Sequence, residues 1–209
     1  MEDLLNLYSQ RKAEIRKRLG DFKELWNRED ERIFAELCFC LCTPQSRAES
    51  CWKAVSKLMG SGVLLKGKAK DIEGFLANVR FPENKARYIH EAKNSFTVNG
   101  RIRIKDKINP DNIKETRAWF LKNVKGLGLK EVNHFLRNIG FGDELAILDR
   151  HILKNLVRYN VIETIPKTLT PKKYSDVEEK MKQFSERLGI PLGELDLLFW
   201  SKETGKIFK

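Results

Sequence analysis

The sequence lacks any stretch that approaches the roughly 18–20 uninterrupted apolar residues of a membrane span. Its charged start also lacks the apolar region of a signal peptide. We therefore expect an intracellular protein, which in a prokaryote would act in the cytoplasm or nucleoid, and we expect no membrane partner. Because repeats, low-complexity tracts and coiled-coil heptads are absent as well, we expect a monomer.

Cysteine and histidine are scarce. The four cysteines lie in one apolar segment: Cys38, Cys40, Cys42 and Cys51. This clustering predicts buried structural thiols and not a disulfide framework, which would be spread over loops. A metal site is the alternative, but the C-x-C-x-C positions fan around a helix, and the spacing of an iron–sulfur loop is absent. Since His90, His134 and His151 are widely scattered, we expect no catalytic metal and no cofactor.

Negative charge is in short supply. The chain has 40 Lys and Arg against 29 Asp and Glu, which gives a net charge of +11 over 209 residues. The hydrophobic share of 41% and the charged share of 33% are typical of a folded protein with a substantial core and exclude disorder throughout. The positive surplus favours polyanionic partners, with DNA, RNA and anionic membranes as the candidates.

Strand-like alternation is rare, and most segments repeat their apolar residues with helical spacing, so we expect an all-α fold. The helices are expected at residues 33–42, 46–59, 71–77, 84–96, 111–123, 132–139, 149–157, 177–188 and 191–199. A small hairpin is expected within 97–108, around Asn99-Gly100. Asn109 followed by Pro110 resembles a helix start, and Gly140 a helix end.

A short glycine turn separates two of these helices. Gly126-Leu127-Gly128 places backbone N–H groups at the start of the second helix, where they can bind a phosphate. Glycine would allow the close approach of a nucleic-acid backbone and would permit a positive φ. The plainer alternative is that these glycines only make a tight turn in an αα-hairpin.

Two further residues make the pattern specific. Lys130 follows the turn, and Asp149 stands nineteen positions later at the head of the next expected helix. The segments VKGLGLKEV (124–132) and LDRHIL (148–153) resemble the helix-hairpin-helix and Asp-bearing loop of DNA base-excision glycosylases. Where that hairpin usually carries proline, this chain has Lys125, a departure that affects the stiffness of the turn. The tail, LGELDLLFW (192–200) and TGKIFK (204–209), resembles the archaeal-type second family of 8-oxoguanine DNA glycosylase/AP lyases.

This resemblance implies an architecture. Residues 1–209 would form one glycosylase unit of two helical subdomains with a DNA-binding cleft between them, and the helix-hairpin-helix would span about 111–139. The approximate subdomains are 30–105 and 106–165. The N-terminal helix and residues 166–209 would pack alongside.

The resemblance also implies a chemistry that excises 8-oxoguanine from double-stranded DNA. Positive charge builds on the sugar as the base departs, so Asp149 would stabilise the transition state while also capping its helix. Lys130, attacking as a neutral amine, would form a Schiff base, after which β-elimination cuts the strand. The alternative for Lys130 alone is one more phosphate contact.

A base pocket is implied as well. Asp196 and Trp200 lie four residues apart and so share one helix face, although a core Trp and a surface Asp are the alternative. The resemblance implies that Trp200 and Phe81 sandwich the base and that Lys209 contributes through its terminal carboxylate. Because 8-oxoguanine carries a proton at N7 and guanine does not, an acceptor at N7 would discriminate between them. That acceptor could be Lys209, Asp196 or a main-chain carbonyl.

Other positions are expected to contact DNA. Gln45 lies where related enzymes insert residues into the duplex, with an exposed loop residue as the alternative. Contacts are also expected from Gly126, Gly128, Lys125 and Arg150. In related hairpins, the main-chain carbonyls that match Lys122, Val124 and Leu127 hold a structural monovalent cation.

Two other functions fit parts of the pattern. A non-catalytic helix-hairpin-helix module would need the glycines and the basic charge, but not both Lys130 and Asp149. A related glycosylase for another damaged base is the second alternative. The endonuclease III branch is disfavoured, because the chain lacks a C-terminal cysteine cluster.

Overall fold

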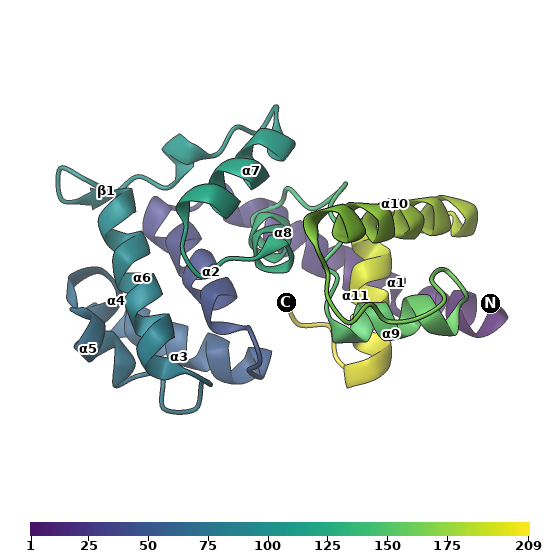
Figure 1. Ribbon diagram of the computed structural model, residues 1–209, viewed down its shortest axis with the longest axis horizontal. Coiled ribbons are helices and arrows are strands. Elements are labelled where there is room, and N and C mark those ends of the chain that lie inside the picture. Colours follow the sequence, from purple (N-terminus) through teal and green to yellow (C-terminus); the bar gives the residue numbers. More distant parts are fainter. The chain divides into compact units, whose positions relative to one another are not determined.

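The computed structural model describes residues 1–209 and is mostly helical, which confirms the all-α prediction. Its helices are α1 (Glu2–Leu25), α2 (Asp30–Cys42), α3 (Ala48–Gly60), α4 (Val63–Lys66), α5 (Ala69–Glu73), α6 (Pro82–Phe96), α7 (Ile113–Asn123), α8 (Leu129–Asn138), α9 (Arg150–Arg158), α10 (Pro171–Leu188) and α11 (Leu192–Thr204). Two compact units are formed, one from residues 1–24 and 136–209 and the other from residues 25–135 (Figure 1). The subdomains expected from the sequence instead begin at residues 30 and 106.

The second unit, residues 25–135, is built around α2. Every residue from Ile33 to Cys42 is buried, and all of them except Glu36 are apolar. Phe96 of α6 contacts both Phe34 of α2 and Phe120 of α7, with ring centroids 6.2 and 5.8 Å apart. All four cysteines are buried free thiols, as predicted, and burial raises the pKa of Cys51 to about 11.

The expected hairpin is confirmed in the same unit. Strands β1 (Thr97–Val98) and β2 (Arg101–Ile102) pair antiparallel, with Val98 opposite Arg101. Asn99 and Gly100 have φ angles of 50° and 77°, which is the conformation of a type I′ turn. A two-residue loop of this kind joins strands that follow the natural right-handed twist.

The start of α7 is not where the sequence suggested. Asn109 does not cap a helix beginning at Asp111, because its side chain accepts the N–H of Asp111 in an Asx turn at 3.0 Å. The true N-cap is Asn112, whose side chain accepts the N–H of Glu115 at 3.1 Å. Two consecutive Asn-based turns therefore precede the helix, and Pro110 belongs to the first of them.

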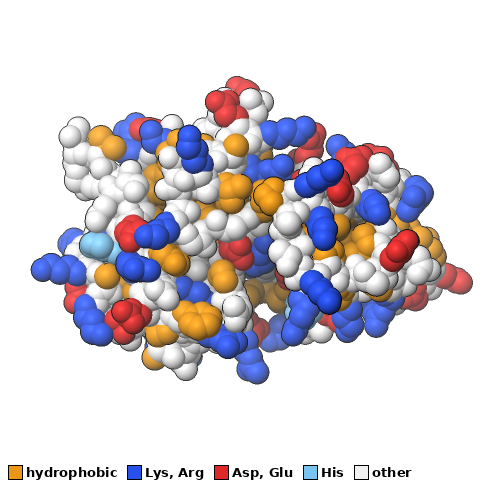
Figure 2. Space-filling view, viewed as in Figure 1, with side chains coloured by type: hydrophobic (Ala, Val, Ile, Leu, Met, Phe, Trp, Pro, Cys, Tyr) orange, Lys and Arg blue, Asp and Glu red, His pale blue; other side chains and the backbone are white.

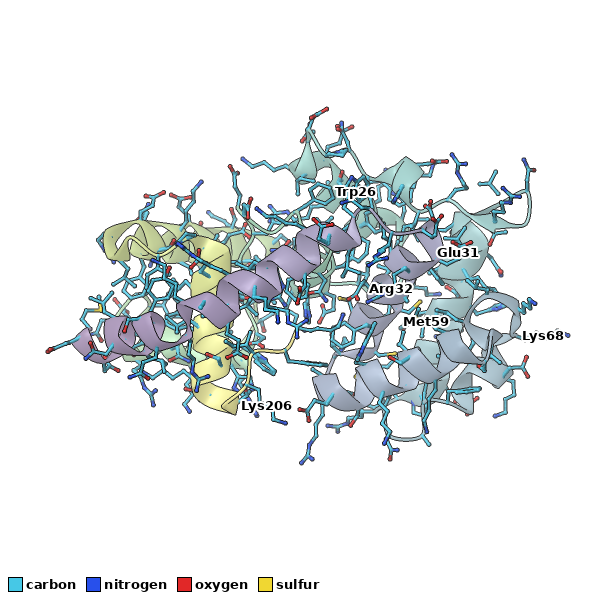
Figure 3. All side chains as sticks on the ribbon, turned by 180° about the vertical axis from the view of Figure 1, so that it is seen from behind. Trp26, Glu31, Arg32, Met59, Lys68 and Lys206 are labelled. Atoms are coloured by element: carbon cyan, nitrogen blue, oxygen red, sulfur yellow. The ribbon has the colours of Figure 1, made fainter.

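In the first unit, α1 lies against α11 (Figure 3). Tyr8 Oη donates to Glu194 Oε2 at 2.5 Å, and Arg11 donates to the carbonyl of Ser201 at 3.0 Å. Burial together with the bond to Glu194 raises the pKa of Tyr8 to about 12. These contacts join the two ends of the chain into one helical layer.

Helices α9 and α10 complete the first unit. Tyr159, just after α9, stacks on Phe199 of α11 and on Phe184 of α10, with centroids 5.8 and 6.1 Å apart. Helix α10 starts at Pro171 behind the N-cap Thr170 and ends at Leu188, followed by the C-cap Gly189 with a φ of 64°. The helix expected at 177–188 is confirmed but begins six residues earlier, and its residues Val177, Met181 and Phe184 are buried.

Lys and Arg side chains are spread over the visible face of each unit and are mixed with Asp and Glu, as Figure 2 shows. The positive surplus is therefore distributed on this face and is not gathered into one patch. No helix combines the length and apolar character that crossing a membrane would require.

Candidate functional site

The glycine turn between α7 and α8 is shaped by Gly126. Its φ of 89° confirms the expected positive value. A Cβ added at this position would lie 2.4 Å from the Tyr88 ring of α6. Within the protein, glycine is therefore required at this position by an aromatic ring. This contact fixes the turn against α6.

Glu131 occupies the start of α8. Its Oε2 accepts the N–H of Gly128 at 3.2 Å. An acidic side chain thus occupies one of the backbone N–H groups that the sequence analysis expected to bind a phosphate. Sequence reasoning assigned no role to Glu131. In a capping box, the Glu three residues after the N-cap accepts the backbone N–H of the N-cap residue. The spacing Gly128-x-x-Glu131 fits this pattern and could have predicted the bond.

Lys130 leaves the first turn of α8 with its amine held by two groups. Its Nζ donates to Thr43 Oγ1 at 3.3 Å and lies 3.6 Å from Glu131 Oε1. The side chain is 22% exposed, so the amine is oriented and still reachable from solvent. Thr43 belongs to the loop after α2, a contact partner that the sequence did not reveal.

Three more of the predicted residues lie in the same unit. Lys125 is exposed in the turn, with its Nζ 3.7 Å from Glu91 Oε2. Gln45 is exposed in the loop between α2 and α3, and Phe81, which precedes α6, is 48% exposed. Both Gln45 and Phe81 have positive φ angles, of 55° and 58°.

Asp149 lies in the first unit and caps α9, as predicted. Its Oδ1 accepts the N–H groups of His151 and Ile152 at 2.8 and 2.9 Å. Both of these bonds use the same oxygen, so Oδ2 is left for another partner. The carboxylate is half-buried, and the neighbouring Arg150 is exposed.

Asp196 is buried, which excludes the surface charge considered for it. Its Oδ2 accepts a hydrogen bond from Arg137 Nη1 at 3.1 Å, with both side chains less than 7% exposed. The Arg137 guanidinium also lies 4.9 Å from the centre of the Phe22 ring. A Cβ at Gly142 would come within 2.4 Å of the Arg137 side chain, so that glycine makes room for the ion pair.

Trp200 and Lys209 stand at the end of the first unit. Trp200 is half-buried on α11, so its ring is not a fully enclosed core residue. The helix stops at Gly205, which has a φ of 76°, and the tail then places Ile207 and Lys209 at 8% exposure each. The last residue is therefore packed and is not a free end.

The predicted residues thus divide between the two units. The second unit holds Gln45, Phe81, Lys125, Gly126, Gly128 and Lys130, and the first holds Asp149, Arg150, Asp196, Trp200 and Lys209. Each unit supplies one of the two residues expected to act in the chemistry.

Replacing Gly126 by Ala should cost more stability than replacing Gly100 by Ala. Both glycines have a positive φ, which an alanine adopts at a cost of about 1–2 kcal/mol. Only Gly126 faces a ring, since the space around Gly100 is open. Urea unfolding of the two variants would measure the difference. Equal losses would contradict the close packing on Tyr88.

Asp196→Asn should lower the free energy of unfolding by about 3–5 kcal/mol, because it leaves Arg137 charged and buried. The matched control is Asp143→Asn in the same unit, whose pair with Lys23 is exposed and contributes about 0–1 kcal/mol. Chemical denaturation is the measurement. A loss at Asp196 no larger than that at Asp143 would show that the buried pair is not needed for stability.

Comparisons with known proteins agree with one another. Residues 15–190 match the family model of 8-oxoguanine DNA glycosylase. A curated 8-oxoguanine DNA glycosylase/AP lyase of Fusobacterium nucleatum is 44% identical over 99% of this chain and 96% of its own. One from Methanocaldococcus jannaschii is 39% identical over 100% and 97%.

Solved structures give the same result. The crystal structure of the M. jannaschii 8-oxoguanine glycosylase/lyase in complex with a 15mer DNA containing 8-oxoguanine has a TM-score of 0.88 and 36% identity, and the match covers all of both chains. The Thermotoga maritima 8-oxoguanine DNA glycosylase has a TM-score of 0.83 and 32% identity over 100% of this chain and 97% of its own. The chain therefore belongs to the 8-oxoguanine DNA glycosylase family.

Proposed function

We propose that this chain excises 8-oxoguanine from double-stranded DNA and then cuts the strand at the resulting abasic site. Membership of the 8-oxoguanine DNA glycosylase family supports the substrate. The names of the curated relatives, 8-oxoguanine DNA glycosylase/AP lyase, support both activities. The observation that carries the proposal is that hydrogen bonds orient both side chains and leave a reactive atom available on each. Lys130 Nζ is bonded to Thr43 and remains reachable from solvent, and Asp149 is bonded through Oδ1, which leaves Oδ2 available.

Lys130 is the proposed nucleophile. Its neutral amine attacks C1′ of the sugar, the bond from C1′ to N9 of the base breaks, and the base leaves with the bonding electrons and takes up a proton. The remaining amine proton passes to O4′ as the bond from C1′ to O4′ breaks, which opens the ring and gives a Schiff base. A proton then leaves C2′, a double bond forms between C2′ and C3′, and the bond from C3′ to O3′ breaks, so that the 3′ phosphate leaves with the bonding electrons.

Asp149 is the proposed electrostatic partner. As the glycosidic bond lengthens, positive charge develops on the sugar, and a fixed carboxylate stabilises that charge more than it stabilises the ground state. Oδ1 is engaged by the amides of α9, so Oδ2 is the oxygen that faces the sugar in this proposal. The chain itself supplies both groups, and no cofactor enters the scheme.

For base recognition we propose Trp200 and Phe81 as stacking surfaces and the Lys209 carboxylate as the acceptor for N7–H. Asp196 is less suited to that contact, because Arg137 already holds it. Asp196 would then act by fixing α11, the helix that carries Trp200. An acceptor left unpaired against guanine costs about 1–3 kcal/mol, which favours the oxidised base.

The remaining contacts serve the DNA backbone. We propose that Lys125, Arg150 and the amides of Gly126 and Gly128 contact phosphates, with Glu131 yielding the Gly128 amide when DNA binds. The carbonyl of Val124 accepts only a 3.4 Å bond from the amide of Leu127 and keeps a lone pair. A monovalent cation held there with the carbonyls of Lys122 and Leu127 would be structural. We place the enzyme inside the cell, acting as a monomer.

Borohydride reduction during turnover should trap a covalent complex of wild-type protein with an 8-oxoguanine duplex, because a Schiff base is reduced to a stable amine. Lys130→Gln should give no complex while still binding the duplex, and Asp149→Asn should excise about 10²–10³-fold more slowly. Lys114→Gln, which removes an exposed lysine of α7, is the control and should be trapped normally. A wild type that never traps would remove the lyase activity from the proposal.

Deleting Lys209, or extending the chain beyond it, should reduce 8-oxoguanine excision by roughly 5- to 150-fold, the equivalent of about 1–3 kcal/mol. Cleavage of a preformed abasic site should fall much less, because no base is present to be read. The same extension placed at the N-terminus is the control. Equal losses on the two substrates would mean that the tail does not read the base.

A further inference from the structure

Two exposed residues of the second unit share an unusual backbone. Gln45, between α2 and α3, and Phe81, just before α6, both have φ near +55° to +58°. A non-glycine residue in this region costs about 1–2 kcal/mol and persists only when its surroundings hold it there. The two turns are far apart in the sequence, so contacts from other segments must hold both residues in this conformation.

Ser46 joins the two turns directly. Its Oγ accepts the backbone N–H of Arg80 at 2.9 Å, which ties the residue after Gln45 to the residue before Phe81. The same oxygen accepts a hydrogen bond from Lys85 Nζ at 3.0 Å. The Ser46 hydroxyl of the first loop therefore accepts hydrogen bonds from both the backbone of Arg80 and the side chain of Lys85.

Lys85 holds the rest of the loop. Its Nζ also donates to the carbonyls of Cys42 and Pro44 at 2.6 and 2.7 Å, and the residue is only 4% exposed. An ammonium has three protons, and here all three point to acceptors of one short loop. With these groups drawn inward, Gln45 is the residue left facing solvent.

The burial of this charge is informative. Burial lowers the pKa of Lys85, which reflects the cost of removing an ammonium from water. An apolar side chain would fill the same space without that cost, so packing alone does not call for lysine. The ammonium instead fixes the positions of three oxygens of the loop. The same loop contains Thr43, whose hydroxyl contacts Lys130.

We propose that Lys85 is a positioning residue that locks the loop Cys42–Ser46 and the turn Arg80–Phe81 into one rigid element for nucleotide extrusion. On this element, Gln45 enters the space that the nucleotide vacates, and Phe81 stacks on the extruded base. Their separation is then set before DNA binds, so that filling the gap and clasping the base occur together. The inference rests on the proposed function, because it concerns the step before excision.

The test compares two buried lysines of α6. Lys85→Met removes the three bonds to the loop. Lys93→Met, the control, removes an equally buried ammonium that donates at 2.6 Å to the carbonyl of Gly67, outside both turns. Thermal melts of both variants report stability, and 2-aminopurine opposite 8-oxoguanine reports opening of the stack by its fluorescence.

We expect Lys85→Met to excise 8-oxoguanine roughly 10²-fold more slowly and to lose most of the fluorescence rise. Borohydride trapping on a preformed abasic site should be retained, because Lys130 is intact and no base has to be extruded. Lys93→Met should behave like the wild type in all three assays. Equal excision and fluorescence in the two variants would overturn the proposal, as would losses that follow stability alone.

A second comparison separates positioning from general support. If Lys85 acts through Gln45, then Gln45→Ala should slow excision in the wild type but have little further effect in Lys85→Met. Fully additive effects would contradict the proposal.

Should Lys85→Met not fold, Ser46→Ala tests the same link, and it should reduce fluorescence and excision in the same direction. A wild type that neither excises nor traps would overturn the proposed function itself, whereas an active wild type with unchanged variants overturns only this inference.

Discussion

The absence of a side chain at Gly126 determines the geometry on which the proposed role of Lys130 depends. The Tyr88 ring lies where a Cβ would be, so the turn can approach α6 only as glycine. Helix α8 starts from this turn, and Lys130 leaves its first turn toward Thr43. One helix, α6, therefore seats the hairpin through Tyr88, braces the loop after α2 through Lys85, and begins next to Phe81.

The first unit is organised around buried charge. Arg137 and Asp196 form a pair with almost no exposure, and the buried Glu194 of the same helix α11 accepts from Tyr8 and pairs with the exposed Arg16 of α1. Such groups are costly to desolvate, so their geometry must be well satisfied. Both pairs anchor α11, and the residues proposed to read the base lie on this helix or just beyond it.

Much of this could be predicted from local sequence signals. Asp149 as an N-cap, Gly140 and the Asn99-Gly100 turn depend on a few adjacent residues, and each was identified correctly, since Gly140 has a φ of 93° just after α8 ends at Asn138. Asn109 and Asn112 show the limit of such signals, because either could have capped the helix and only the competing Asx turn decides between them. The apolar stripes gave most of the helices, since burial follows their period, but they did not give α1 or α4.

Long-range polar contacts were not predictable in the same way. Lys85 and Lys93 lie on the stripe of α6 with Ile89 and Phe96, and their position on an apolar face was a signal of burial that could have been noticed. The partners of Lys85 come from a loop about forty residues earlier, which no periodicity identifies. Asp196 was correctly placed beside Trp200 on one helix, but Arg137 comes from a segment 59 residues away.

The way in which Asp149 is held has a consequence for timing. A carboxylate on a flexible loop would have to be oriented as the substrate arrives, and the loss of freedom would weaken binding. Here two amides of α9 fix the group beforehand. In the proposed mechanism its field is therefore already aligned, and little reorganisation energy remains to be supplied when the sugar becomes cationic. The folding of α9 would then prepare the electrostatics of bond cleavage in advance.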